Sequence, residues 1–352
     1  MAGDLNSSIT ALIRCDASPE IGLGHLVRCL SLAEVLEKHY GVNPVFAMRL
    51  DPLFYGVIRR RCQAITMPRG KSQSTWLAEK LRQYRAQLLI VDVRDDLSRQ
   101  ELQAIRSDGI RVAVIDDLSD RRLASDLAFY PPVPQVRKAD WSGFTGEVFC
   151  GWQWVILRPD LPQAARVGSA KRPHLLVTMG GSDPAGLTLQ AVSGLDLLDL
   201  EFATTVLLGP GFAHNDALSQ LLSRTRRRFV VLRGPDDIPS VMTRADLAVC
   251  SFGVTAYELA AAGIPAVYLC LTPDHAESAS ALAAGGMGVS LGIFKAVTHN
   301  QLAATVRDLL VNRQRLECMR GQARRTIDGM GAARVAEALA KRMSWQRIRE
   351  KF

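Results

Sequence analysis

The chain alternates short apolar runs, rich in β-branched residues, with longer segments in which apolar residues recur every three or four positions. The short runs are typical of buried strands and the longer segments of helices that cover a sheet. This alternation is characteristic of parallel α/β units. The first half predicts strands at 9–15, 43–48, 87–92 and 111–116, helices at 25–39, 74–84 and 98–107, and a closing apolar run, VFCGWQWVIL, at 148–157.

The same alternation begins again after 158–173, a segment with three prolines and little periodicity that we interpret as an interdomain linker. The second half predicts strands at 174–179, 203–208, 228–233, 246–251 and 265–271, and helices at 185–195, 255–262, 276–284 and 300–312. We therefore expect two doubly wound Rossmann-like domains, 1–157 and 174–333, with a central cleft. Ligands of such sheets bind at the carboxyl ends of the strands.

The last segment, 334–352, predicts a basic amphipathic helix with Trp345, Ile348 and Phe352 on one side. We expect it to pack against one of the domains. A helix that lies on a membrane surface is the alternative.

Length and composition fit an ordinary soluble globular protein. The 352 residues suit two domains. No window approaches the roughly 18 uninterrupted apolar residues of a membrane span, and the first residues lack a signal-peptide pattern. We expect a cytoplasmic protein. The seven cysteines show no metal-ligand spacing and are expected to be reduced thiols.

The net charge of +8 favours anionic partners without choosing among them. The basic clusters at 59–61 and 226–228 are not interleaved with the aromatic residues of a nucleic-acid platform. We interpret them as solvated ends of helices or loops and expect no nucleic-acid partner.

The stretch IGLGHLVRCLSLA at 21–33 places a histidine at a predicted helix start. Gly22 and Gly24 allow the backbone to approach a ligand, and the helix N-terminus favours an anion. His25 lies off the apolar stripe, with Arg28 one turn later, and within reach of Asp16 it would be a general base near neutral pH. The alternative is a simple turn followed by a polar residue.

A second strand, double glycine and helix start occur in LLVTMGGSDPAGLT at 175–188. Gly180, Gly181 and Ser182 are candidate ligand-binding residues. Helix capping by Ser182 or Asp183, with Pro184 in the first turn, explains the same residues without a ligand.

The third candidate segment is DLAVCSFGVTAYELAAAGIPAVYL at 246–269. Ser251, Gly253, Val254 and Thr255 follow a strand and place hydroxyl and backbone N–H groups around a diphosphate. Glu258 is suitably placed for a ribose diol. Because T-x-x-E is also a capping box, a structural role for Thr255 and Glu258 is the alternative.

Other catalytic patterns are absent from the sequence. The chain contains no D-x-D pair, and its acidic runs at 92–96 and 116–117 lack nearby histidine ligands, so a catalytic metal is not expected. It also lacks a phosphate-binding P-loop motif and a G-x-S-x-G elbow. The usual sequence motifs for ATP hydrolysis and ester hydrolysis are therefore missing.

Taken together, these segments resemble the UDP-2,4-diacetamido-2,4,6-trideoxy-β-L-altropyranose hydrolases of pseudaminic acid biosynthesis. The matching pieces are RCDASPEIGLGHLVRCLSLA, VIDDLSDR, GWQWVILRP, MGGSDP and SFGVTAYELAAAGIPAVYL, which follow the family's order between 14 and 269.

The resemblance implies a glycosyltransferase-B-like architecture in which the C-terminal domain holds the UDP, with no metal and no cofactor. It implies that His25 activates a water that inverts the anomeric carbon. Asp16 would orient the imidazole or the sugar, and Glu258 would bind the ribose. The implied partners are the UDP-sugar and other enzymes of a pathway that supplies flagellin glycosylation or surface polysaccharide.

The sequence departs from the family at two places expected to face the substrate. An aromatic residue is expected two positions after Asp92, where this chain has Arg94, and Asn-Gln is usual where it has Asp274 and His275. We count all four as candidate substrate-binding residues. The departures keep two alternatives open: a glycosyltransferase that uses a UDP-sugar donor, and a nucleotide-sugar-binding protein without catalysis.

Overall fold

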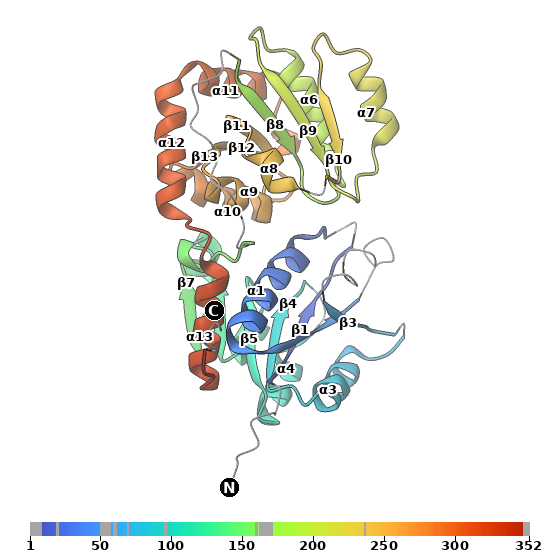
Figure 1. Cartoon of the computed structure of the whole chain (residues 1–352), viewed down its shortest axis with the longest axis vertical. Coiled ribbons are helices and arrows are strands. Elements are labelled where there is room, and N and C mark those ends of the chain that lie inside the picture. The colour runs from blue at the N-terminus through green and yellow to red at the C-terminus, as the bar shows by residue number, and fades with distance from the viewer. Residues whose placement is uncertain are drawn as a thin grey trace, which may run out of the picture. The chain divides into compact units, whose positions relative to one another are not determined.

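The computed structural model describes residues 9–18, 21–49, 58, 62–68, 70–94, 97–158, 161, 172–235 and 237–347. The chain forms two compact units (Figure 1). The first consists of Met1–Ile21, His25–Pro159 and Met330–Phe352, and the second of Gly22–Gly24 and Asp160–Gly329. Most of the predicted linker and the basic cluster at 59–61 lie outside the described residues.

The first unit is built on a seven-stranded parallel sheet in the order β3-β2-β1-β4-β5-β6-β7. Its central strands are continuous apolar runs because helices cover both faces of such a sheet. The strands are β1 (Thr10–Cys15), β2 (Asn43–Met48), β3 (Gln63–Thr66), β4 (Leu88–Asp92), β5 (Arg111–Ile115), β6 (Leu127–Tyr130) and β7 (Glu147–Cys150). The helices include α1 (Gly24–Tyr40), α3 (Gln73–Gln83), α4 (Arg99–Ser107), α5 (Pro134–Lys138) and α13 (Gly331–Met343).

The second unit contains a six-stranded parallel sheet in the order β10-β9-β8-β11-β12-β13. Its strands are β8 (His174–Thr178), β9 (Ala203–Leu208), β10 (Val230–Arg233), β11 (Leu247–Ser251), β12 (Ala266–Cys270) and β13 (Gly288–Ile293). Its helices are α6 (Leu187–Asp196), α7 (Asn215–Leu222), α8 (Ile238–Met242), α9 (Val254–Ala261), α10 (Pro273–Ala284), α11 (His299–Val311) and α12 (Arg313–Thr326).

The predicted fold class of two doubly wound Rossmann-like units is confirmed. Strand positions agree to within a few residues, and the helix predicted at 98–107 begins at Arg99 behind a capping box of Ser98 and Glu101. The sequence analysis missed the short or glycine-containing strands β3, β6 and β13, the short helices α5, α7 and α8, and the polar helix α12. Four-residue strands and a helix with few apolar positions carry too little periodicity to be recognised.

Both sheets change winding direction beside their first strand. In the first unit the chain moves outward from β1 to β2 and β3 and then returns to β4 on the other side of β1. The second unit does the same at β8 and β11. The carboxyl ends of β1 and β4, and of β8 and β11, are therefore the two topological switch points, where open α/β sheets bind ligands.

The C-terminal helix belongs to the first unit, where α13 lies against the 3₁₀ turn η3 (Trp152–Trp154) and beside β7 (Figure 1). It begins at Gly331, three residues earlier than predicted. A Cβ on Gly331 would lie 1.9 Å from the carbonyl oxygen of Val155, so only glycine permits this approach. Ile348 and Phe352 lie outside the described residues.

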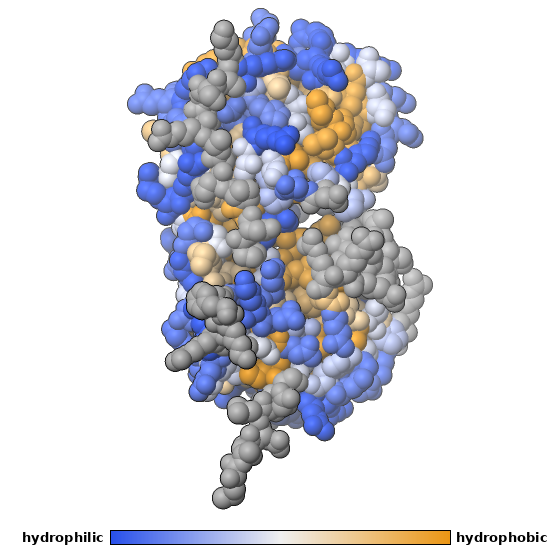
Figure 2. All heavy atoms as spheres, viewed as in Figure 1, coloured by the Kyte–Doolittle hydropathy of each residue, from blue (hydrophilic) through white to orange (hydrophobic). Residues whose placement is uncertain are grey.

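The structure also bears on the expectations about the cysteines and about membrane-spanning segments. All seven cysteines are free thiols, and Cys15, Cys29, Cys250 and Cys270 are buried. No helix in the described ranges combines the length and apolarity needed to cross a membrane. On the face shown in Figure 2, hydrophilic side chains surround separate hydrophobic patches in each unit.

A buried carboxylate ties α13 to the first sheet. Asp126 is fully buried and accepts hydrogen bonds from the Val112 N–H (2.9 Å), Arg106 Nε (3.1 Å) and Arg111 Nη1 (3.3 Å). Arg342 of α13 approaches it to 3.7 Å. One carboxylate thus joins α4, β5 and α13.

We expect Asp126→Asn to lower the free energy of unfolding by about 2–4 kcal/mol, because an amide nitrogen replaces an acceptor among buried donors. Urea unfolding monitored by circular dichroism measures the change. Asp108→Asn, an exposed aspartate at the end of α4, is the control. A loss no larger than the control's would contradict the anchoring role of Asp126.

Candidate functional site

A cluster of charged side chains lies at the β1/β4 switch point of the first unit. Asp92 is the last residue of β4 and pairs in register with Cys15, the last residue of β1. Helix α1 begins at Gly24, so that His25 and Arg28 lie one turn apart on the same side. His25 Nδ1 lies 2.5 Å from Asp92 Oδ1. The sequence reading did not predict this pair.

The Asp92 side chain is 1% exposed and remains ionised. Burial alone would raise its pKa, but the positive charge of Arg28 and the contacts with Arg28 and His25 hold it well below the usual range. Nδ1 of His25 also lies 3.1 Å from Arg28 Nη2, which can only donate. Because the contact with Asp92 is the shorter of the two and a carboxylate only accepts hydrogen bonds, we assign the proton of this contact to Nδ1. In neutral His25 the Nε2 lone pair is then available to take a proton.

Arg28 donates two parallel hydrogen bonds to Asp92, from Nε to Oδ2 and from Nη2 to Oδ1, both 2.5 Å long. Its Nη1 donates to Asp116 Oδ2 at 3.0 Å. Burial would lower the pKa of Arg28, but the charge of Asp92 raises it well above the ordinary value. The Cys29 thiol, kept protonated because burial raises its pKa, donates to Asp92 Oδ2 at 3.4 Å.

Asp116 is the site residue that the sequence reading missed. It directly follows β5, beside β4 in the sheet, and so lies at the same edge as Asp92. The acidic pair Asp116-Asp117 directly after the strand RVAVI is the sequence signal for this position, because it marks carboxylates at the carboxyl end of a strand. Arg94, which stands where an aromatic residue was expected, is 44% exposed, with Nη2 3.7 Å from Asp116 Oδ2.

The predicted partnership of Asp16 with the imidazole is not what the structure shows. Asp16 forms a two-point ion pair with the buried Arg14, with Nη2 and Oδ2 2.7 Å apart, and accepts from the Arg49 N–H at 2.6 Å. Because Asp16 lies in the same loop segment, nine residues before His25, proximity along the chain favoured it. The sheet instead brings Asp92, 67 residues away, to the imidazole.

The second unit places glycine-containing turns at its own switch point. Gly180, Gly181 and Ser182 follow β8, and Gly180 has a φ of 78° that favours glycine. A Cβ on Gly180 would lie 3.8 Å from the Ser251 hydroxyl at the end of β11. The two predicted segments are therefore neighbours.

The free N–H groups at the N-terminus of α6 are bonded to a side chain of the protein itself. The Asp183 carboxylate accepts from the N–H groups of Leu187 (2.8 Å) and Thr188 (2.9 Å). The predicted capping by Asp183 is confirmed, but Pro184 precedes the helix and does not lie in its first turn. A second anion has little to gain at this helix end, because its N–H groups are bonded and a negative charge is present.

The N-terminus of α9 differs because no side chain caps it. The helix begins at Val254 with Gly253 as its N-cap, so the capping box expected from Thr255 and Glu258 is not formed. Among the described residues, no acceptor contacts the N–H groups of Val254 and Thr255. Glu258 is buried one turn further along α9. Of the two helix ends at this switch point, α9 is the one open to a phosphate.

The other departure from the family lies at the start of α10. Thr272 caps this helix by accepting from the His275 N–H at 3.1 Å, and Asp274 is exposed in the first turn. The His275 ring lies 5.9 Å from the ring of Phe252, which follows β11. This places His275 beside the α9 segment.

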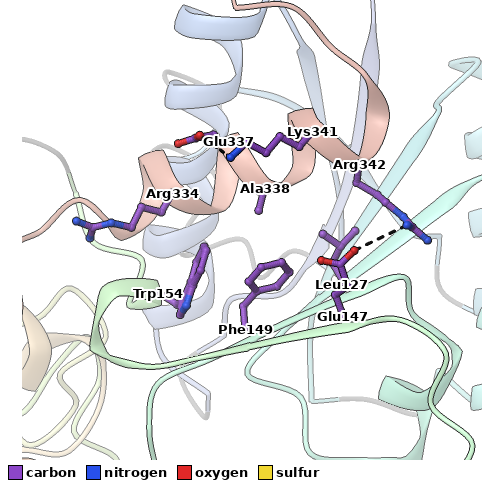
Figure 3. Close-up of a pocket in the computed structure, with 9 residues that line it drawn as sticks. All are labelled: Leu127, Glu147, Phe149, Trp154, Arg334, Glu337, Ala338, Lys341 and Arg342. Atoms are coloured by element: carbon purple, nitrogen blue, oxygen red, sulfur yellow. Dashed lines mark ion pairs between the residues drawn. The ribbon is translucent and has the colours of Figure 1, made fainter.

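A separate hollow of about 430 Å³ lies between α13 and the end of the first sheet. Figure 3 shows Phe149 and Trp154 pointing toward Ala338 of α13, with charged side chains around them. None of the candidate residues lines this hollow. Within the described ranges, no three His, Cys, Asp or Glu side chains are grouped so as to hold a metal ion.

The depressed pKa of Asp92 gives its contribution to stability a defined pH dependence. A group whose pKa is lower in the folded than in the unfolded chain stabilises the fold above its unfolded pKa, about 4 for aspartate. That contribution is lost as the pH falls through the folded pKa.

We therefore expect Asp92→Asn to cost about 3 kcal/mol at neutral pH, because Arg28 loses its main buried acceptor. The difference in free energy of unfolding between wild type and the variant should become smaller as the pH falls below about 4. Urea unfolding of both proteins across this range measures the gap. A difference that does not change with pH would show that the Asp92 charge does not stabilise the fold.

No protein-family model matches the chain. It is 27% identical to an uncharacterized protein of Methanocaldococcus jannaschii over 72% of its own length and 54% of that protein. It is 22% identical to the spore coat polysaccharide biosynthesis protein SpsG of Bacillus subtilis, covering 93% of this chain and 96% of SpsG. The chain thus spans about half of the first relative and nearly all of the second.

Two further relatives match about half of the chain. One is the UDP-2,4-diacetamido-2,4,6-trideoxy-beta-L-altropyranose hydrolase of Campylobacter jejuni, 25% identical over 52% of this chain and 65% of that protein. The other is the UDP-N-acetylglucosamine–N-acetylmuramyl-(pentapeptide) pyrophosphoryl-undecaprenol N-acetylglucosamine transferase of Corynebacterium efficiens, 33% identical over 49% of this chain and 46% of that protein.

Solved structures share the fold over nearly the whole chain. MurG of Acinetobacter baumannii superposes with a TM-score of 0.67 and 16% identity, over 94% of this chain and 99% of MurG. UDP-GlcNAc 2-epimerase of Neisseria meningitidis, solved with UDP-GlcNAc, gives a TM-score of 0.65 and 15% identity over 95% and 100% of the two chains. The expected glycosyltransferase-B-like fold is confirmed.

Proposed function

We propose that the chain hydrolyses a UDP-activated 2,4-diacetamido-2,4,6-trideoxy sugar in nonulosonic (pseudaminic) acid biosynthesis. The observation that carries the proposal is the contact of His25 with the buried carboxylate of Asp92 at the β1/β4 switch point. The half-length match to a relative with this activity, and the full-length match to a polysaccharide biosynthesis protein, support a nucleotide-sugar substrate.

In this reaction Nε2 of His25 removes a proton from water, and the water oxygen forms a bond to the anomeric carbon. The bond between that carbon and the β-phosphate oxygen breaks, and its electrons leave with UDP. Attack from the face opposite the leaving group inverts the anomeric centre. Asp92 holds the Nδ1 proton and stabilises the imidazolium that forms, as carboxylates do behind catalytic histidines.

The second unit supplies the groups for UDP. The uncapped N-terminus of α9 presents the N–H groups of Val254 and Thr255 to the diphosphate. Ser251 and the backbone of Gly180 and Gly253 are further donors, and Glu258 accepts from the ribose hydroxyls. Preorganised donors of this kind commonly contribute a few kcal/mol each to a developing negative charge.

A glycosyltransferase is the second candidate function. It is favoured by the 33% identity to a UDP-N-acetylglucosamine-dependent transferase over about half of the chain. In that reaction His25 would deprotonate an acceptor hydroxyl, and the rest of the site would act in the same way. Arg94, Asp274 and His275 would then contribute to recognition of the acceptor.

We expect His25→Ala to reduce turnover roughly 100-fold or more while UDP affinity and melting temperature stay close to wild type, because a general base is removed from a partly exposed position. UDP release from UDP-2,4-diacetamido-2,4,6-trideoxy-β-L-altrose, with NMR of the sugar product, measures the effect. Calorimetry with UDP provides the binding control.

Three outcomes separate the candidates. Release of free sugar by wild type, lost in His25→Ala, supports the hydrolase. Release that requires an added acceptor supports the transferase. UDP binding with no turnover under either condition would contradict both and leave a binding protein.

We expect Glu258→Gln to weaken UDP binding about 10-fold, because a charged acceptor for two hydroxyls becomes a neutral amide. Glu258 is buried and has contacts of its own in the fold, so the melting temperature is measured beside the affinities. Calorimetry with UDP and with UMP compares the affinities. A large fall in melting temperature at unchanged affinity would show that Glu258 has a structural role instead.

A further inference from the structure

We infer that Asp116 is a positioning residue of this site: together with Arg28 it holds the Asp92 carboxylate in the orientation that fixes the His25 imidazole. The inference rests on the proposed function, in which His25 is the base. Asp116 and Arg28 would act on the reaction through Asp92 and His25. Neither of them needs to touch the substrate.

The Arg28 guanidinium is held from two sides. Its guanidinium is planar and rigid, with donors on two edges. One edge binds both oxygens of Asp92 at 2.5 Å, and Nη1 on the other side donates to Asp116 at 3.0 Å. The side chain of Arg28 is only 12% exposed, so little water can replace either carboxylate. Carboxylates on both sides therefore prevent the guanidinium from rotating.

Arg28 in turn sets the orientation of the Asp92 carboxylate. The two parallel contacts define the plane of the carboxylate, and the same Oδ1 atom that accepts from Arg28 Nη2 also accepts from His25 Nδ1. Rotation of the guanidinium would turn this carboxylate and move Oδ1 away from the imidazole. The orientation of Arg28 therefore determines the direction in which His25 Nε2 points.

The backbone of Asp116 has a φ of 52°, in the left-handed region. Non-glycine residues adopt this conformation at a cost of about 1 kcal/mol or more, aspartate more readily than most. The Asp116 N–H donates to Phe129 O at 2.9 Å, which ties this conformation to the neighbouring strand. Strain of this kind concentrates at functional sites.

The neighbouring aspartate, Asp117, supplies the side-chain contacts that close the turn after β5. Asp117 is buried, pairs with Arg121 and accepts from the Ser119 N–H and hydroxyl groups. Among the described residues, the Asp116 side chain contacts Arg28 and, at 3.7 Å, Arg94. The two adjacent carboxylates therefore have separate roles.

The test compares Asp116→Gly and Asp116→Asn with wild type, and Asp108→Asn serves as the control. Glycine adopts a positive φ without strain and asparagine tolerates it, and Arg28 keeps its two contacts with Asp92, so both variants should fold with a melting temperature close to that of wild type. We expect turnover to fall roughly 10- to 100-fold with KM and UDP affinity unchanged, because only the geometry of the base is lost. The control should retain wild-type turnover.

A measurement without substrate separates this inference from the proposed reaction. A short hydrogen bond from imidazole to carboxylate gives a far-downfield proton resonance, which histidine-labelled protein and the His25→Ala variant assign to His25 Nδ1–H. The resonance should be present in wild type and Asp108→Asn and lost or shifted in both Asp116 variants, whether or not the chain hydrolyses the sugar. An unchanged resonance in Asp116→Gly, or a fall in melting temperature that accounts for the lost turnover, would overturn the inference.

Discussion

The buried carboxylate of Asp92 is the constraint on which the first-unit site depends. A charge at this depth is tolerated only when it is paired and hydrogen-bonded. Arg28 supplies the countercharge, and His25 and Cys29 supply further donors. Because these three residues lie on one helix, satisfying Asp92 also determines how the start of α1 docks on the sheet. The same contacts that stabilise the ion therefore aim the imidazole.

The two units use the same topology for different chemistry. Each places polar residues at the switch point beside its first strand, but the first unit assembles ionisable side chains and the second assembles glycines, hydroxyls and a free helix N-terminus. The contrast between α6 and α9 is informative, since both helices begin at this point. The Asp183 carboxylate bonds N–H groups in the first turn of α6, whereas α9 starts behind a glycine that has no side chain to cap it. A phosphate would therefore find unbonded donors at α9.

Much of the fold could be predicted from the chain because its strands are continuous apolar runs and its helices have clear periodicity. The elements that were missed are those with weak patterns, such as the strand LAFY of β6 and the polar helix α12. The domain boundary also required the structure. Residues from Met330 onward belong to the first unit, although they follow the second in the sequence. No local pattern encodes a return of this kind, since it depends on the contact of Gly331 with Val155.

The sequence by itself determined the candidate segments: the G-L-G-H turn, the double glycine after β8 and the S-F-G-V-T turn after β11 are all local patterns. It also determined which helix starts carry polar residues. Only the tertiary structure decided which side chains act together. His25 pairs with Asp92 and not with Asp16, Arg28 is shared with Asp116, and Thr255 does not form a capping box with Glu258. The physical reason is that parallel strands bring residues far apart in the chain to one edge of a sheet, where burial of charge selects the partners.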